Sequence, residues 1–329
     1  MVKVIFEEVK GQDRAQRIVK NILSKPFIQN LLFTGPAGVG KRTTALLVAR
    51  MLNCLNATGC GSCRNCVRIS RMNFPDLHLL VPLSRKELLS DRVKDYLLGQ
   101  TAPPLQQNEI ITIDHVRDII TEAQRPTVEG RRVIIIVHVH RMRYVAVSAL
   151  LKIIEEQPNN TLFILTTPQL SSIPDTIQSR CQVVRFNYPT TNQVLEVLNN
   201  KGIIAPIIVP GSPGDTIRFI NSNSFDLSKR IFLKSPFPEK RYTRVINRLK
   251  AKEYDLRELI QNLLNWYQLL LYARLNPSLT SDEDILIKSR KMDIERITNT
   301  IEAILRINNI LDFHPNRRLL VFNLLEALC

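Results

Sequence analysis

The chain has 329 residues, of which 44% are hydrophobic and 23% charged, and this ordinary mixture excludes a mainly disordered protein. The longest unbroken aliphatic run, Val133–Val137, is too short to cross a bilayer, so no membrane association is expected. Lys and Arg number 45 against 30 Asp and Glu, and the net charge of +15 favours a polyanionic partner such as nucleic acid.

A glycine-rich loop follows the first predicted strand. The apolar run Asn30–Thr34 predicts a short strand, and residues 35–41 (GPAGVGK) then lead into a predicted helix, Arg42–Leu52. This match to G-x-x-x-x-G-K between a strand and a helix indicates a phosphate-binding loop, whose backbone N–H groups surround phosphate oxygens. The nucleotide-binding residues predicted in this loop are Gly35, Gly38, Gly40, Lys41 and Thr43.

Arg42 stands where this motif normally has a Ser or Thr whose hydroxyl holds Mg²⁺. A guanidinium cannot be a metal ligand, and Thr43 and Thr44 come one and two places late. We therefore expect the shape of the loop to persist without its metal contact. The residues leave open whether ATP or ADP still binds there.

Four of the six cysteines lie close together in the chain. Cys60, Cys63 and Cys66 are separated by two residues each, and Cys54 comes six residues earlier. Four thiolates with this spacing predict one tetrahedral, structural Zn²⁺ ion. Disulfides, free thiols and an iron–sulfur cluster are the alternatives. The other two cysteines are isolated and are expected to serve packing.

Three further apolar runs predict strands that are buried on both faces of a parallel sheet. They are Arg132–Val137, Leu162–Thr167 and Gln182–Phe186, and the stretch Ala146–Glu156 predicts a helix between the first two.

The end of the second predicted strand lacks the acidic residues that an ATPase of this kind needs. One carboxylate there would hold Mg²⁺ through water, and the next would polarise the attacking water. Val137 and His138 occupy the two positions, and neither can replace a carboxylate. His138 and His140 are expected to share a strand face, but no third ligand accompanies them, so a metal site is not predicted there.

The pattern changes after Tyr188. Thr190 or Thr191 is expected to cap a helix over Gln193–Asn199, and residues 189–235 contain several Pro and Gly. Beyond them, apolar residues recur every three or four positions, which predicts a helical bundle.

With these motifs in place, the chain resembles the bacterial AAA+ clamp-loader subunits of DNA polymerase III, and among them the delta-prime group. The resemblance is strongest over residues 1–188. Beyond the loop and the cysteines, the motifs that carry it are Val9-Lys10-Gly11-Gln12, residues 149–156 (ALLKIIEE), Ser179-Arg180-Cys181 and residues 315–320 (PNRRLL).

The resemblance implies an α/β then all-α architecture. It would comprise a P-loop AAA+ parallel-sheet domain over residues 1–188 with a zinc module at 54–66, a small helical lid over 189–235, and a helical collar over 236–329. It also implies a cytoplasmic subunit that joins gamma/tau and delta subunits in a hetero-pentamer. This complex loads a sliding clamp onto primer–template DNA.

The resemblance also assigns roles to single residues. Arg180 would be an arginine finger for the ATP of a neighbouring subunit, and Thr167 would lie at the nucleotide from the third predicted strand. The arginines expected to contact DNA are Arg117, Arg125 and Arg131.

The departures at Arg42 and at Val137-His138 favour a subunit that does not hydrolyse ATP on its own. The resemblance also implies a second sensor arginine near Asn223–Leu227, and the sequence has no arginine there. An active gamma/tau-type ATPase, a stand-alone nucleic-acid-binding protein with a zinc module, and a small-molecule phosphotransferase are the alternatives. The last lacks an acidic base near the loop.

Overall fold

The computed structural model describes residues 9–24, 29–83, 109–158, 160–203, 211–236, 255–277, 280, 282–311 and 316–328. The chain divides into two compact units, Met1–Lys201 and Gly202–Cys329. Helix α8 (Thr191–Asn200) therefore belongs to the first unit, whereas the expected lid from residue 202 onward belongs to the second. The division into three domains stays a prediction, and Pro315 of the expected closing motif lies outside the described residues.

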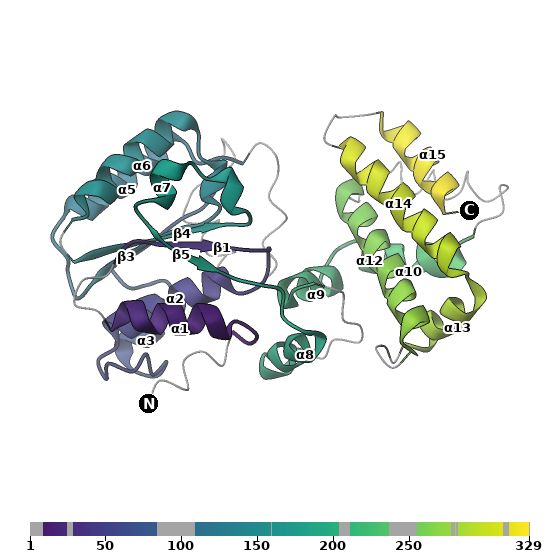
Figure 1. Cartoon of the computed structure of the whole chain (residues 1–329), viewed down its shortest axis with the longest axis horizontal. Coiled ribbons are helices and arrows are strands. Elements are labelled where there is room, and N and C mark those ends of the chain that lie inside the picture. The colour runs from purple at the N-terminus through teal and green to yellow at the C-terminus, as the bar shows by residue number, and fades with distance from the viewer. Residues whose placement is uncertain are drawn as a thin grey trace. The chain divides into compact units, whose positions relative to one another are not determined.

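The first unit is built on a five-stranded parallel sheet with the strand order β2-β3-β4-β1-β5 (Figure 1). Each end of the four predicted strands is confirmed to within one residue, whereas β2 was not predicted. The strands are β1 (Leu31–Thr34), β2 (Leu77–Leu80), β3 (Arg132–Ile136), β4 (Thr161–Thr167) and β5 (Gln182–Arg185).

Helices cover both faces of this sheet, and alternate strand residues feed two separate cores. Leu31 and Phe33 of β1 belong to one core, while Leu32 between them belongs to the other. Helices α1 (Asp13–Leu23), α2 (Lys41–Asn53) and α3 (Arg64–Ser70) pack on the first face. Helices α5 (Ile113–Gln124), α6 (Tyr144–Glu156) and α7 (Asp175–Gln178) pack on the second (Figure 1).

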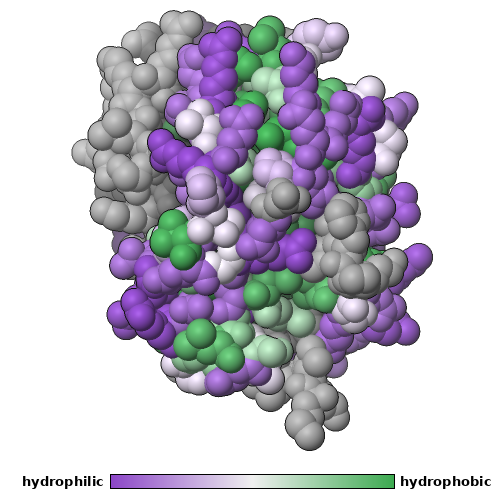
Figure 2. All heavy atoms as spheres, turned by 90° about the vertical axis from the view of Figure 1, so that its left-hand side faces the viewer, coloured by the Kyte–Doolittle hydropathy of each residue, from purple (hydrophilic) through white to green (hydrophobic). Residues whose placement is uncertain are grey.

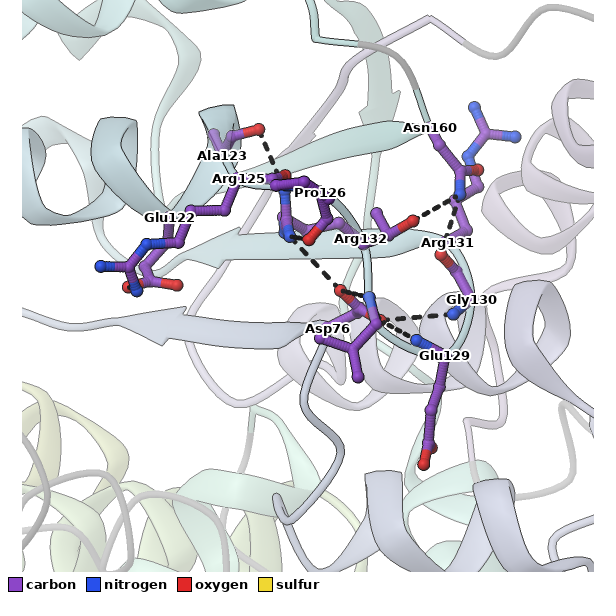
Figure 3. Close-up of polar contacts among 12 residues, drawn as sticks. Asp76, Glu122, Ala123, Arg125, Pro126, Glu129, Gly130, Arg131, Arg132 and Asn160 are labelled. Atoms are coloured by element: carbon purple, nitrogen blue, oxygen red, sulfur yellow. Dashed lines mark hydrogen bonds and ion pairs between the residues drawn. The ribbon is translucent and has the colours of Figure 1, made fainter.

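A buried ion pair fixes the chain just before β2 to the start of β3 (Figure 3). The side chains of Asp76 and Arg132 are 0% and 3% exposed, and a guanidinium nitrogen lies 3.4 Å from a carboxylate oxygen. The Asp76 carboxylate also accepts the backbone N–H groups of residues 128–130 at 2.8–3.3 Å. Arg132 in turn donates, at 2.6–3.0 Å, to the backbone carbonyls of Ala123, Arg125 and Pro126.

Every element that the structure describes in the second unit is a helix, as the 3–4 spacing predicted. Its centre is Trp266, whose ring contacts three phenylalanine rings and whose indole N–H donates to the Ser228 hydroxyl at 2.9 Å. The helices are α9 (Pro213–Ile220), α10 (Phe225–Lys234), α12 (Leu256–Leu275), α13 (Glu283–Lys291), α14 (Ile294–Ile310) and α15 (Arg317–Ala327).

A buried lysine closes the carboxyl end of α10. The Lys288 ammonium donates to the backbone carbonyls of Phe232 and Ser235, and to the Ser235 hydroxyl at 3.0 Å. Burial, together with the charge of Arg296, lowers the pKa of Lys288 to about 8. The dipole of a helix stabilises a cation at its C-terminus. Burial opposes this effect for the Lys288 ammonium, because it removes the charge from water.

Replacing Arg132 with Met should destabilise the sheet, because the Asp76 carboxylate would stay buried without its cation. Loss of one partner of a buried pair costs about 3–5 kcal/mol. Native-state hydrogen exchange of the β3 amides measures this loss. Arg117→Met is the matched control, since Arg117 makes an exposed pair with Asp114 that is worth about 1 kcal/mol or less. Equal effects of the two variants would contradict the role of the buried pair.

The stability of the second unit should rise with pH above about 8. Lys288 has a folded-state pKa of about 8 and a reference value of 10.5, so between these values the unfolded chain binds more protons. Urea unfolding followed by the fluorescence of Trp266, the single tryptophan, reports this unit alone. The rise between pH 8 and 10.5 should be smaller in Lys288→Met. An unchanged slope in the variant would show that another group causes it.

Candidate functional site: the phosphate loop, the cysteine cluster and an exposed arginine

The predicted phosphate loop connects β1 to α2. Gly35, Gly38 and Gly40 have φ angles of 139°, 72° and 99°, which residues with a Cβ rarely adopt. A Cβ on Gly35 would also lie 2.2 Å from the carbonyl oxygen of Phe186, directly after β5. The loop thus has a backbone that requires glycine, and the end of β5 packs against it.

Lys41 begins α2 and directs its ammonium back into the loop. Its Nζ donates to the backbone carbonyls of Gly35 and Pro36, and the side chain is nearly buried. The positive charge is therefore already inside the loop, at the N-terminus of a helix whose dipole has the same sign.

Thr43 and Thr44, the two threonines that follow Arg42, differ in burial and in hydrogen bonding. The buried Thr44 donates its hydroxyl to the carbonyl oxygen of Gly40 at 2.9 Å, within its own helix turn. Thr43 and Arg42 are half-buried on the first turn of α2. The predicted contact of Thr43 with a nucleotide stays a prediction.

The chain turns sharply after β3, where an ATPase would carry its two carboxylates. Val137 is buried, and His138 has a φ of 56°, with its backbone N–H donating to the Thr166 hydroxyl at 3.2 Å. A short 3₁₀ turn, Val139–Arg141, follows. The expectation that His138 and His140 share a strand face is therefore wrong, because the left-handed backbone at His138 ends the extended conformation. Their rings lie 5.5 Å apart, edge to face.

His140 lies near the lysine of the loop. Burial, together with the positive charges of Arg141 and Lys41, lowers the pKa of His140 to about 4, so its imidazole is neutral. Its Nδ1 is buried and has no hydrogen-bond partner within the described part of the chain.

Thr167 ends β4 beside Thr34, the residue that leads into the loop. It is fully buried, and its hydroxyl donates to the backbone carbonyl of Gln169 at 3.0 Å and lies 3.3 Å from the Ser172 hydroxyl. The hydroxyl predicted to contact a nucleotide thus shapes the turn after β4. The neighbouring Thr166 is the one that contacts the turn after β3.

The four clustered cysteines converge in space. The Sγ atoms of Cys54, Cys60, Cys63 and Cys66 lie within 4.8 Å of one another, and that of Cys54 lies 3.6 Å from Cys60 and 3.9 Å from Cys63. Sulfur atoms bound tetrahedrally to zinc at about 2.3 Å stand about 3.8 Å apart, whereas a disulfide requires about 2.05 Å. The donor set therefore fits a zinc ion.

Hydrogen bonds favour the thiolate form in two of these cysteines. Burial raises the pKa of Cys54, but bonds from the backbone N–H groups around it, that of Cys60 first, outweigh burial and lower the pKa to about 7. The Ser62 hydroxyl, followed by the backbone of Cys63, lowers the pKa of Cys60 to about 5. Burial raises that of Cys66 to about 12, so this thiol needs a cation beside it to ionise near neutral pH.

Residues 54–66 are attached to the sheet through the loop before β3. The Asn53 side chain accepts the backbone N–H of Arg131 at 2.7 Å and donates to the carbonyl of the same residue at 3.0 Å. Asn65 donates to the backbone carbonyl of Asn53 at 3.0 Å. Glu129, in the loop before β3, also forms ion pairs with two arginines of α3.

Arg180 follows α7 and lies on the surface. Its Nε is 2.7 Å from a carboxylate oxygen of Glu155 on α6, and the two side chains are 38% and 48% exposed. It also donates to the backbone carbonyl of Thr176 at 2.9 Å. The side chain is thus held at an exposed position by a partner on its own chain.

The three arginines predicted to contact DNA have different environments. Arg117 pairs with Asp114 at 3.4 Å, and Arg125 pairs with Glu122, both around α5. Arg131 is half-buried; burial lowers its pKa, and its Nε has no hydrogen-bond partner among the described atoms. Of the three, Arg131 alone has its backbone bonded to Asn53 beside the cysteine cluster.

The parallel sheet, the loop and the helical second unit define a P-loop protein of the AAA+ type. The family model described as "DNA polymerase III, delta subunit" matches residues 11–190, which is more than half of the chain, and the chain belongs to this family. A solved structure of a DNA polymerase III gamma subunit-related protein from Thermotoga maritima has the same fold, with a TM-score of 0.51 and 16% identity. The alignment covers 95% of this chain and 98% of that one.

Curated relatives match somewhat more than half of the chain. DNA polymerase III subunit delta' of Bacillus subtilis is 33% identical over 179 residues, which are 53% of this chain and 47% of that protein. Subunit tau of the same organism is 30% identical over 199 residues, 59% of this chain and 31% of that protein. The chain thus spans less than half the length of these relatives.

Within the ranges that the structure describes, every helix is too short or too polar to cross a bilayer.

The purified chain should contain about one zinc ion, because four sulfur donors fit one tetrahedral site. Elemental analysis by plasma mass spectrometry measures this content. Cys63→Ser should lower the zinc content severalfold, whereas Cys181→Ser, a change outside the cluster, should leave it unchanged. Metal far below one equivalent in the unmodified chain would contradict the zinc assignment.

Proposed function

We propose that this chain is a delta-prime-like subunit of the DNA polymerase III clamp loader. It would join gamma/tau and delta subunits in a hetero-pentamer and help to place the sliding clamp on primer–template DNA. The observation that carries this proposal is a phosphate loop with its glycine backbone kept and its catalytic positions changed, in a member of this family.

In this proposal the chain does not hydrolyse ATP on its own. Hydrolysis needs a hydroxyl for Mg²⁺ and a carboxylate to polarise water, and Arg42, Val137 and His138 stand at those positions. His140 is close to the loop, but burial, together with the positive charges of Arg141 and Lys41, lowers its pKa and keeps it a weak base. The subunit would instead be a fixed member of the assembly.

Arg180 would act on the ATP of a neighbouring subunit. An arginine that approaches the γ-phosphate from another subunit stabilises the charge of the transition state. Its exposure and its position in a Ser-Arg-Cys sequence support this role. Its partner Glu155 is also exposed. An exposed ion pair contributes little free energy, so breaking it to release the arginine would cost little.

The remaining parts of the proposal concern metal and DNA. Zinc held by the four cysteines would be structural, with no open position for chemistry. The net charge of +15 would favour contact with the phosphate backbone of DNA without sequence preference. The proposed contact residues are Arg117, Arg125 and Arg131.

Arg180→Ala should reduce the clamp- and DNA-stimulated ATPase of the reconstituted complex by about 10³-fold at the neighbouring site, the low end of the known range for arginine fingers. The complex should still assemble, as gel filtration would report. Arg218→Ala changes another exposed arginine that has an ion-pair partner, and it should leave turnover unchanged. Full turnover in the Arg180 variant would reject the finger.

The gamma/tau relatives favour one alternative, an active ATPase. Steady ATP turnover by the isolated chain, abolished by Lys41→Ala, would establish it. In the delta-prime-like assignment, Lys41→Ala should barely change clamp loading by the complex.

A further inference from the structure

Three positions of the phosphate-loop site differ from the usual pattern, and all three changes alter its charge in the same direction. Arg42 adds a positive charge where a neutral hydroxyl is usual, and Val137 and His138 replace two carboxylates. A usual site uses those oxygen ligands to hold Mg²⁺, which then neutralises the phosphates. Here the ligands for the metal are lost, while fixed positive charge is gained.

Two positive charges act on the His140 imidazole beside the loop. Burial, Arg141 and Lys41 all lower the pKa of His140, and none of the causes is a carboxylate. Its buried Nδ1 also lacks a partner within the described ranges. The positive charges of Lys41 and Arg141 near this imidazole favour an anion beside the loop.

The loop itself keeps what is needed to surround a phosphate. The positive φ angles of Gly35, Gly38 and Gly40 set its backbone, and the N-terminus of α2 follows directly. The Lys41 ammonium is held within the loop by two of its carbonyls, so little ordering of this side chain is needed on binding.

We propose that this loop binds the linked phosphates of a di- or triphosphate without a divalent metal. Lys41 and Arg42 supply the charge that Mg²⁺ supplies elsewhere. Free pyrophosphate and the phosphates of a nucleotide share this chemistry. Binding of this kind would leave the ligand intact, because the site has neither the metal nor the carboxylate that hydrolysis requires.

Calorimetric titration of the full chain tests the proposal. Pyrophosphate, ADP and ATP are each titrated, once with EDTA and once with excess Mg²⁺. The proposal expects binding in EDTA that Mg²⁺ weakens or leaves unchanged, because the metal neutralises the ligand. Equal affinities for pyrophosphate and the nucleotides would show that the phosphates alone are bound. Tighter binding of ADP and ATP would show an additional contact to the nucleoside. Either result supports the proposed phosphate site. Binding that requires Mg²⁺, or no binding at millimolar ligand, would overturn it.

Variants locate the binding. Lys41→Ala should weaken binding in EDTA at least tenfold, while Lys152→Ala, an exposed lysine on α6, should not change it. If Lys41→Ala disturbs the fold, His138→Glu gives an independent test, since one added negative charge should weaken binding by about tenfold. His138→Gln is its neutral control. Equal affinity of the Glu and Gln variants would overturn the electrostatic basis of the proposal.

This inference and the clamp-loader assignment can fail separately. Phosphate binding is measured on the isolated chain, whereas the assignment depends on assembly and on the effect of Arg180. A chain that assembles and supports turnover but binds no phosphate would reject the inference alone.

Discussion

The buried pair of Asp76 and Arg132 is the constraint on which much of the first unit depends. Two charges without water are stable only if nearly every donor and acceptor is satisfied, and here backbone groups on both sides satisfy most of them, the Arg132 Nε being the exception among the described atoms (Figure 3). Asp76 accepts from the loop before β3, while Arg132 donates to the end of α5 and the same loop. The pair therefore defines where α5 ends and where β3 begins.

The same loop also supports the cysteine cluster. Asn53, directly before Cys54, bonds to Arg131 in both directions, and Glu129 pairs with α3. Fixing the loop thus also fixes residues 54–66. Figure 2 shows one side of the molecule, where the described surface is largely hydrophilic with a few hydrophobic side chains between. The cysteines are in this way part of the sheet domain rather than an appended module.

The sequence was sufficient to predict the strands with continuous apolar runs, the phosphate loop and the four cysteines, because each is a local pattern. It could not predict β2, whose short apolar run is interrupted by His78, or the Asp76–Arg132 pair, which joins residues 56 positions apart. The turn at His138 was missed because a positive φ at a non-glycine residue has no clear sequence signal. Thr167 ends β4 as predicted, its hydroxyl bonds the turn that follows, and its contact with a nucleotide stays a prediction.

The contact between Arg180 and Glu155 has a consequence for how a surface arginine can be regulated. An exposed ion pair is worth about 1 kcal/mol or less, so Glu155 restrains the Arg180 side chain but leaves it able to bind another anion. A multiply charged phosphate approaching from outside would compete with a single carboxylate and win, whereas a weaker anion would not. In the proposed assembly, Glu155 would thus set a threshold of ligand charge below which Arg180 stays paired on its own chain, a form of discrimination that needs no movement of the backbone.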